Sequence, residues 1–442
     1  MSSLQPTFSS KSSTNFNEFQ WVIQIQKTLE EELEYDGEIP VSIFNVPKAL
    51  LASDPDSYIP QEVAIGPYHY LRPELYEMER YKVAAAKRTQ KQLQCLKFQD
   101  LVEQLKKLEP RIRACYHKYL DFNGDTLGWM MAIDASFFLE LLEIYGAKEG
   151  RVLTRVSSRM SHLVDVSGSK SAHHAILRDL VMLENQIPLF VSRRTLEFQF
   201  KSLEQADDML LSMLMGLCKE LSPFKVEDQD LPKIQVSECA HLLDFLYQMI
   251  TPKLERRPSE IVEAEDEGES TPHKESKSSD SPNFVSSFCR SLDVNTEVIL
   301  RNLVAYEVSN ASGPLVFTRY TELMNGIIDT EEDAKLLREK GIILNRLKSD
   351  EEVAKVWNGM SKSIRLTKVP FLDKAIEDVN KYYNGRWKVK MTKFMKVYVF
   401  GSWQFIAVLA GLLLLLLMTL QAFCSVYSCS RVFHITTTTT ST

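Results

Sequence analysis

The sequence lacks the signatures that usually identify an enzyme or a metal site. It contains no GxGxxG, GxxxxGK[ST], HExxH or GxSxG motif, and the lysine, catalytic-loop and DFG motifs of protein kinases are missing. None of its seven cysteines forms a CxxC pair, so neither a zinc site nor a complete disulfide framework is indicated. We therefore predict no cofactor, no metal ion and no known catalytic residue.

Glycine and proline are also scarce, and the net charge is small. The chain has 16 Gly and 17 Pro in 442 residues, few runs of β-branched residues, and long stretches rich in Leu, Glu, Lys and Gln. This composition favours helices over strands and predicts a mainly α fold with a large helical globular body. The net charge of −7 gives no general argument for a nucleic-acid partner, so none is predicted.

Charge is absent from one long stretch, residues 397–430, and its central part from Trp403 to Phe423 is almost entirely apolar. A helix of that length spans about 31 Å, which matches the hydrocarbon thickness of a bilayer. We therefore expect a single C-terminal transmembrane helix. Because six basic residues lie between 381 and 396 and only Arg431 follows, the positive-inside rule predicts a cytoplasmic body. The start of the chain shows no secretion signal, and we expect the plasma membrane as the location.

The pattern divides the chain into six segments. They are a loose tail at 1–15, a first body part at 16–254, an acidic and Ser-rich disordered linker at 255–286, a second body part at 287–396 that ends in a basic juxtamembrane stretch, a transmembrane segment at 397–426, and a short Thr-rich tail at 427–442.

Helical spacing is clearest in three stretches of the body. Residues 16–35 predict an amphipathic helix, residues 127–145 a nearly all-apolar core helix, and TEVILRNLVAYEVSN a helix after the linker. Five prolines interrupt residues 40–70, so this stretch is expected to form extended segments and turns.

Three acidic residues stand in apolar surroundings with the same spacing. Asp134, Glu184 and Glu307 each follow apolar residues at i−3, i−4 and i−7, which predicts a carboxylate on the buried face of a helix. A buried carboxylate must be protonated or hydrogen-bonded to Arg, Lys, Tyr or backbone N–H groups. The candidate cationic partners are Arg113, Arg178, Arg301 and Arg319. Both a structural polar network and an active site would produce this pattern.

One of these acids belongs to the stretch LENQIPLF at residues 183–190. We predict that Pro188 ends a helix whose last turn is LENQ, so that Asn185 and Gln186 donate to carbonyl groups of that turn. An ionised Glu184 only accepts hydrogen bonds, so it is expected to contact another segment.

Other candidate sites are weaker. The adjacent His173 and His174 point about 100° apart on a helix and do not form a metal pair. The linker offers Ser259, Thr271 and Ser281 as phosphate acceptors, although an unmodified linker fits equally well. The sequon at Asn310 would carry a glycan only if the body were lumenal, which the predicted topology disfavours.

Several stretches together resemble a plant family, the domain of unknown function 247 or UPF0481 proteins. They are VSIFNVPKAL, YIPQEVAIGPYHY, MERYK, DASFFLEL, LENQIPLF, RNLVAYE and the apolar C-terminal stretch. The chain departs from the usual pattern at Ala135, where a glycine is common. The resemblance implies a plant membrane protein with a helical body and no established enzyme chemistry, and it gives no catalytic residues to carry over.

Two function classes follow. The first is a membrane-anchored protein that recognises another protein or acts in signalling. The alternative is an uncharacterised enzyme that uses Asp134, Glu184 or Glu307 for acid/base chemistry. An open cleft lined by two acids would favour the enzyme, whereas a closed core would favour the recognition protein.

Overall fold

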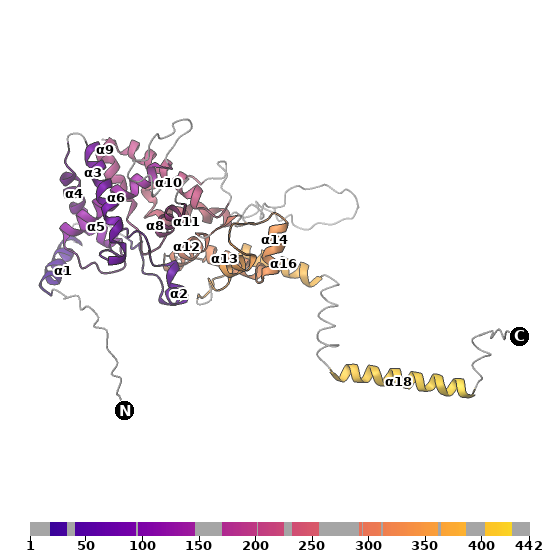
Figure 1. Ribbon diagram of the computed structural model, residues 1–442. Coiled ribbons are helices and arrows are strands. Elements are labelled where there is room, and N and C mark those ends of the chain that lie inside the picture. Colours follow the sequence, from indigo (N-terminus) through magenta and orange to yellow (C-terminus); the bar gives the residue numbers. More distant parts are fainter. Residues whose placement is uncertain are drawn as a thin grey trace, which may run out of the picture. The chain divides into compact units, whose positions relative to one another are not determined.

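Almost every ordered element of the computed structural model is a helix, which confirms the mainly α fold (Figure 1). The chain forms two compact units, Met1–Val369 and Pro370–Thr442. The structure describes residues 18–32, 40–93, 96–145, 170–200, 202–224, 232–255, 291–293, 295–310, 313–360, 364–385 and 403–426. Both expected tails, the linker after Glu255 and residues 386–396 of the juxtamembrane stretch lie outside the described residues.

The first unit contains most of the helices. They are α1 (Glu18–Glu32), α2 (Lys48–Ser53), α3 (Tyr76–Gln92), α4 (Phe98–Lys107), α5 (Glu109–Ala114), α6 (Gly124–Glu143), α8 (Lys170–Leu180), α9 (Leu189–Phe200), α10 (Leu203–Leu221), α11 (Leu242–Glu255), α12 (Thr296–Asn310), α13 (Val316–Ile327), α14 (Glu331–Glu339) and α15 (Asp350–Trp357). Short 3-10 turns lie at Pro55–Ser57 (η1), Pro73–Leu75 (η2) and Val236–Glu238 (η4).

Helix α6 is the central helix of the first half because its sequence is apolar on nearly every side. Its N-terminus is capped by Asn123, whose Oδ1 accepts the Thr126 N–H at 2.7 Å. The helix packs against α3, α4, α9 and α10, which surround it in Figure 1. Each fully buried Leu or Phe in such a core contributes about 1.5–3 kcal/mol. The core helix expected at 127–145 is thus confirmed, with bounds shifted to Gly124–Glu143.

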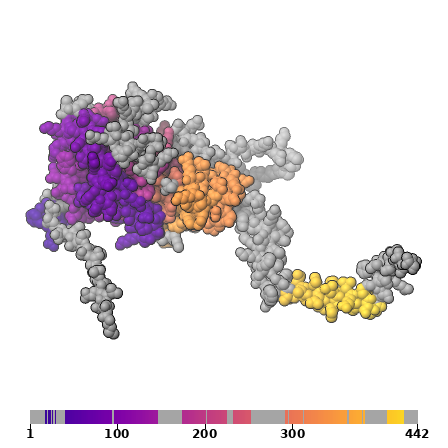
Figure 2. Space-filling view, in the orientation of Figure 1, coloured from indigo at the N-terminus to yellow at the C-terminus, as the bar shows by residue number. Residues whose placement is uncertain are grey.

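Helix α12 has the same role in the second half. It consists of the stretch TEVILRNLVAYEVSN, and all of its residues from Val298 to Glu307 are buried. It packs between α11 and α13 and also contacts η1 from the first half. In the space-filling view the orange residues of this region adjoin the purple and magenta residues (Figure 2). A two-residue parallel pairing of β1 (Ser291–Leu292) with β2 (Leu344–Asn345) is the one sheet among the described residues.

Residues 40–70 form an irregular segment, as its prolines predict. Only α2, η1 and an isolated bridge between Ile43 and Tyr116 interrupt it. Its later part, residues 63–69, is nevertheless fully buried. Because buried backbone N–H groups need partners, this segment depends on other parts of the chain for its hydrogen bonds.

The second unit contains α16 (Pro370–Gly385) and α18 (Trp403–Val426). Within α18, residues 407–426 are long and apolar enough to cross a membrane. The consecutive leucines at 412–417 are 55–63% exposed. The expected transmembrane segment at 397–426 therefore corresponds to a helix that begins at Trp403, and residues 397–402 lie outside the described part.

Candidate functional site

Buried polar side chains supply hydrogen-bond partners to the backbone of residues 40–70. The clearest case is Asp179, whose side chain is fully buried at the end of α8. Its Oδ2 accepts three consecutive backbone N–H groups, from Gln61 at 3.0 Å, Glu62 at 2.6 Å and Val63 at 3.0 Å. One carboxylate oxygen thus fixes a turn of the irregular segment.

Asp134 on α6 holds the next part of the segment together with Lys82 on α3. Its Oδ2 accepts the Gly66 N–H at 2.8 Å, and its Oδ1 lies 2.6 Å from Lys82 Nζ. Lys82 also contacts Glu79 Oε1 at 2.6 Å and donates to the Ala64 carbonyl at 2.9 Å. These three contacts occupy all three N–H groups of the ammonium.

Both members of this ion pair are almost completely buried, with side chains 2% exposed. Burial disfavours the charged lysine, but the carboxylates of Asp134 and Glu79 outweigh it and raise the pKa of Lys82. Burial raises the pKa of Asp134, against the opposing effects of Lys82 and the Gly66 N–H. The lysine therefore carries its positive charge at neutral pH.

The LENQ stretch fixes the segment at two further points. Asn185 Oδ1 accepts the Ile65 N–H at 2.7 Å, while its Nδ2 donates to the carbonyls of Val63 and Asp179 at 2.9 Å. Glu184 Oε1 accepts the Val46 N–H at 2.8 Å, as expected for an acid that contacts another segment.

Gln186 connects the end of α8 to α11. Its Nε2 donates to the carbonyls of Leu180 at 2.7 Å and Met182 at 2.9 Å, and its Oε1 accepts the Leu243 N–H at 3.3 Å. The two amides thus donate to carbonyl groups near the helix end, as predicted. Asn185 and Gln186 are 1% and 2% exposed, so the stretch belongs to the core.

The predicted position of the helix end is wrong. Helix α8 ends at Leu180, so LENQ follows the helix, and Pro188 instead lies immediately before α9. The side-chain amides of Asn185 and Gln186 donate to the carbonyls of Asp179 and Leu180 at the helix end. These carbonyls therefore have partners without a further helical turn, and the helix can end there. Glu184 is therefore not on a helical face, and its side chain is 16% exposed.

Glu307 on α12 binds the N-terminus of α13. Its Oε1 accepts the Phe317 N–H at 2.8 Å, and its Oε2 accepts the N–H of Thr318 at 2.7 Å and the hydroxyl of Thr318 at 2.6 Å. The Tyr247 hydroxyl donates to Oε1 at 2.7 Å. The first N–H groups of a helix lack partners within it and favour negative charge nearby, so Glu307 caps α13.

A second buried network joins α11 to the start of the irregular segment. His241 Nε2 lies 2.9 Å from the Ser42 carbonyl, and its Nδ1 accepts the Asp244 N–H at 3.2 Å. Asp244 accepts the Ala240 N–H at 2.7 Å and the Tyr306 hydroxyl at 2.9 Å. Burial lowers the pKa of His241, which keeps the ring neutral with Nε2–H as the donor.

His69 is a buried histidine without such a network. Its Nε2 has no hydrogen-bond partner and lies 3.7 Å from Glu184 Oε2. Burial, with smaller contributions from Arg72 and Lys118, lowers the pKa of His69 to about 4. Burial also raises the pKa of Glu184, against the Val46 N–H. His69 is therefore neutral at physiological pH.

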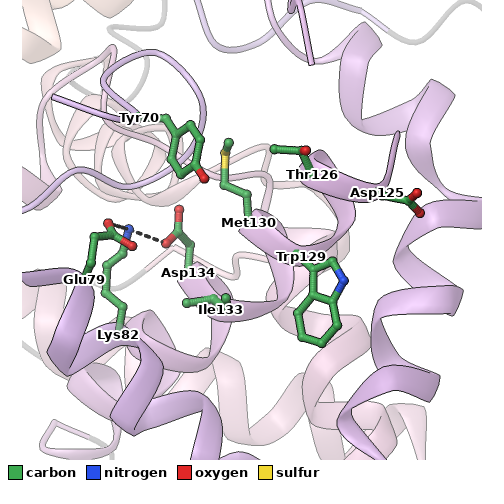
Figure 3. A pocket seen from close by; sticks show the side chains of 9 residues that line it. All are labelled: Tyr70, Glu79, Lys82, Asp125, Thr126, Trp129, Met130, Ile133 and Asp134. Atoms are coloured by element: carbon green, nitrogen blue, oxygen red, sulfur yellow. Dashed lines mark hydrogen bonds and ion pairs between the residues drawn. The ribbon is translucent and has the colours of Figure 1, made fainter. Parts of the chain in front are cut away.

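One pocket of about 290 Å³ opens beside the Asp134 pair (Figure 3). It lies between the start of α3 and one face of α6, and its residues are Tyr70, Glu79, Lys82, Asp125, Thr126, Trp129, Met130, Ile133 and Asp134. Of the three acids predicted from sequence, only Asp134 contributes to it. Figure 3 shows the Asp134 carboxylate at its inner wall, facing Lys82 and Glu79 on one side.

The predicted arginine partners mostly contact other acids. Asp134 is paired with Lys82 and not with one of these arginines, while Glu184 and Glu307 accept backbone N–H groups; a lysine and backbone N–H groups were both among the expected partners. Three of the four arginines pair as Arg113 with Glu109 at 2.8 Å, Arg178 with Asp179 at 3.4 Å, and Arg301 with Asp54 at 3.1 Å. Among the described residues no group of three or more His, Cys, Asp or Glu side chains is arranged to hold a metal ion.

The predicted modification sites fall mainly outside the described part. Ser259, Thr271 and Ser281 all lie there. Asn310 is the exposed last residue of α12, and its Nδ2 donates to the Tyr306 hydroxyl at 2.9 Å.

The model of the DUF247 family, described as "Plant protein of unknown function", matches residues 43–287 and 288–417. The chain belongs to the DUF247 family. Two relatives from Arabidopsis thaliana agree with this assignment. This DUF247 chain is 44% identical to the UPF0481 protein At3g02645, over 96% of this chain and 98% of the relative. It is 26% identical to the UPF0481 protein At3g47200, over 90% of this chain and 88% of the relative. None of the solved structures matches it.

Sequence reasoning missed several of the residues that hold this DUF247 fold together. Asp179 follows Ile176, Ala175 and Ala172 at i−3, i−4 and i−7, so the spacing that found the other acids was present with smaller residues. Lys82, His241 and Asp244 carry no comparable pattern, because their partners come from distant parts of the chain.

Proposed function

We propose that this protein is a membrane-anchored recognition component whose helical body binds another protein. The observation that carries the proposal is that the carboxylate oxygens of the interior acids accept hydrogen bonds from other segments of the chain. Asp179, Glu184 and Glu307 accept backbone N–H groups of other segments, and Asp134 accepts one while it neutralises Lys82. Acids engaged in this way hold the fold together, which leaves the surface as the place for function.

The anchor is supported by the character of α18. Twenty residues from Ala407 to Val426 would extend about 30 Å as a helix, and most of the side chains that they display are apolar. Water-soluble proteins rarely expose an apolar surface of this extent. We propose that α18 crosses the plasma membrane and that the preceding basic residues keep the body in the cytoplasm.

Two measurements test the anchor. Deletion of residues 403–426 is expected to move the protein from the alkali-resistant membrane pellet to the soluble fraction, and retention in the pellet would contradict the anchor. A glycosidase-sensitive mass shift that disappears in Asn310→Gln would place the body on the lumenal side instead.

The recognition role is tested by proximity labelling with the full-length protein in its native membrane. We expect one set of neighbours to be labelled reproducibly by a fusion to the body and lost when the body is replaced by an unrelated domain on the same anchor. Identical labelling from the two fusions would show that the membrane, and not the body, selects the neighbours.

An acid/base enzyme is the second candidate, and one observation favours it. Asp134 and Glu79 both line an open pocket, as a pair of catalytic carboxylates would. Against this, Lys82 donates to both, so Asp134 has a structural partner on each oxygen. Asp134→Asn with normal stability but no biological activity would support the enzyme.

A further inference from the structure

Helix α18 has two different sides within residues 407–426. Because successive residues are rotated by about 100°, every glycine and alanine of this range, its one amide and its one serine lie within about 70° of a single direction around the helix. They are Ala407, Ala410, Gly411, Gln421, Ala422 and Ser425. The opposite side consists mainly of large apolar residues, which are Leu409, Leu412, Leu413, Leu416, Leu420 and Phe423. Contact with lipid on all sides gives no reason for this separation, whereas contact with a second helix does.

Gly411 allows a close approach between helices. Its φ is not positive, and a Cβ built there would meet no atom of the described residues within 4 Å. Helix α18 itself therefore does not need a glycine at this position. Ala407 lies one turn before Gly411, so the two form a pair of small residues on the same side. In membranes such a pair lets two helix backbones approach closely, and the packing contacts that result drive association.

Gln421 supplies an independent reason for a partner. It lies inside the span, about 7 Å along the helix from the end at Val426. Its side-chain amide has no hydrogen-bond partner among the described residues, whereas the Thr419 hydroxyl donates to the Leu416 carbonyl at 2.8 Å. In hydrocarbon no water replaces the missing bonds, so the amide is stabilised by a polar group from another helix.

We propose that α18 pairs in parallel with α18 of a second copy of this chain, along the side that carries Gly411 and Gln421; this inference rests on the proposed membrane anchor. The central residues of that side follow one another at steps of four and three, the spacing that keeps two helices in contact over their length. They are Ala407, Gly411, Leu414, Met418, Gln421 and Ser425. In a parallel two-fold pair each of them meets its own counterpart.

A second copy fits this side better than an unrelated helix does. An amide carries both donors and an acceptor, so the Nε2–H of each Gln421 donates to the Oε1 of the other. Residues 407–426 contain no charged group that would repel its counterpart. Among the described residues α18 is the one candidate span, so a partner span comes from another chain. The pair brings two recognition bodies together, which strengthens binding to any target that offers two sites.

Energy transfer between two fluorescently labelled forms of the full-length protein tests the pairing. The protein is reconstituted in phosphatidylcholine vesicles that contain no other protein. We expect transfer that rises with the protein-to-lipid ratio and falls when unlabelled protein is added in excess. Gly411→Leu and Gln421→Leu should each weaken association by at least about threefold. Both changes make the span more apolar, so both variants remain in the membrane.

Each variant has a matched control on another side of α18. Thr419→Val also replaces a polar side chain by an apolar one, but the Thr419 hydroxyl is bonded within its own helix. Leu413→Phe adds bulk, as Gly411→Leu does, but on the opposite side. Both controls should associate like the wild type.

Oxidative crosslinking supplies a second measurement in the same vesicles. Met418→Cys places a thiol at the centre of the proposed contact, and Leu416→Cys places one on the opposite side. Both variants keep the native cysteines, so a difference between them reports only the new position. Copper phenanthroline should increase the yield of covalent dimer for Met418→Cys alone.

Three results would each overturn the pairing. They are the absence of energy transfer in the wild type, equal transfer in the wild type and both face variants, and equal crosslinking at positions 416 and 418. These results leave the proposed function in place if the protein resists alkaline extraction and its body still selects its neighbours. Loss of the protein from the alkali-resistant pellet would instead refute the anchor itself.

Discussion

Replacing Asp179 tests whether buried acids hold the irregular segment. Asp179→Ala removes the acceptor of three N–H groups, of which only Val63 is a buried residue, while Gln61 and Glu62 are exposed enough for water to replace the bond. Stranding one buried N–H costs about 1–3 kcal/mol, and two partly hydrated ones add about 1 kcal/mol each. We therefore expect a loss of about 3–5 kcal/mol in the free energy of unfolding. Asp179→Asn, which retains a neutral acceptor, should lose about half as much.

The assay combines thermal unfolding of the full-length protein in detergent with hydrogen exchange of its amides. Asp179→Ala should lower the melting temperature by on the order of 5 °C. Amides 61–63 should exchange faster in both variants, whereas the exposed α10 residue Asp208 changed to Asn serves as a control and should alter neither measurement. Normal stability in Asp179→Ala, or destabilisation with unchanged exchange at 61–63, would refute the reasoning.

Two further predictions concern His69 and Gly66. The pKa of His69 is about 4 in the folded protein and about 6.5 when unfolded, so the unfolded state binds the extra proton between these values and stability falls as pH decreases through this window. Urea unfolding measures the free energy of unfolding of the wild type and of His69→Gln at pH 7 and pH 4. Between these pH values the wild type should lose up to about 3 kcal/mol more than the variant, and an equal loss in both proteins would contradict this. Gly66 has a φ of 75°, and an added Cβ would lie 2.5 Å from the Gln186 carbonyl, whereas Gly341 has a φ of 69° and open space around it. Gly66→Ala should therefore destabilise the protein by at least about 2 kcal/mol, and Gly341→Ala by about 1 kcal/mol. Equal decreases of the melting temperature in the two variants would show that the contact with the Gln186 carbonyl adds nothing to the cost of the positive φ.

The sequence predicted the helices because their signal is local. Apolar spacing and turn residues located α6 and α12 within a few residues, and five prolines identified the irregular segment. The same spacing placed Asp134 and Glu307 in buried positions, where their side chains are found. For Glu184 the helical premise was wrong, because α8 ends at Leu180.

The partners of these residues could not be predicted because they depend on how distant segments meet. Asp134 is 68 positions from Gly66, and Asn302 donates to the Ser57 carbonyl across 245 positions. Helical periodicity indicates only which face of an element is buried, so it contains no information about the backbone group opposite that face. The pocket likewise arises from the packing of α3 on α6, and no local motif marks it.

The most direct test of a structural role for the acids compares the amide variants Asp134→Asn, Glu184→Gln and Glu307→Gln. For each full-length variant, the melting temperature and the abundance in membranes are measured beside the proximity labelling of its neighbours. We predict that all three variants melt at lower temperature and that labelling decreases only in proportion to the folded protein that remains. Normal melting and abundance with labelling or biological activity lost at two of the three positions would contradict the structural role and favour an active site.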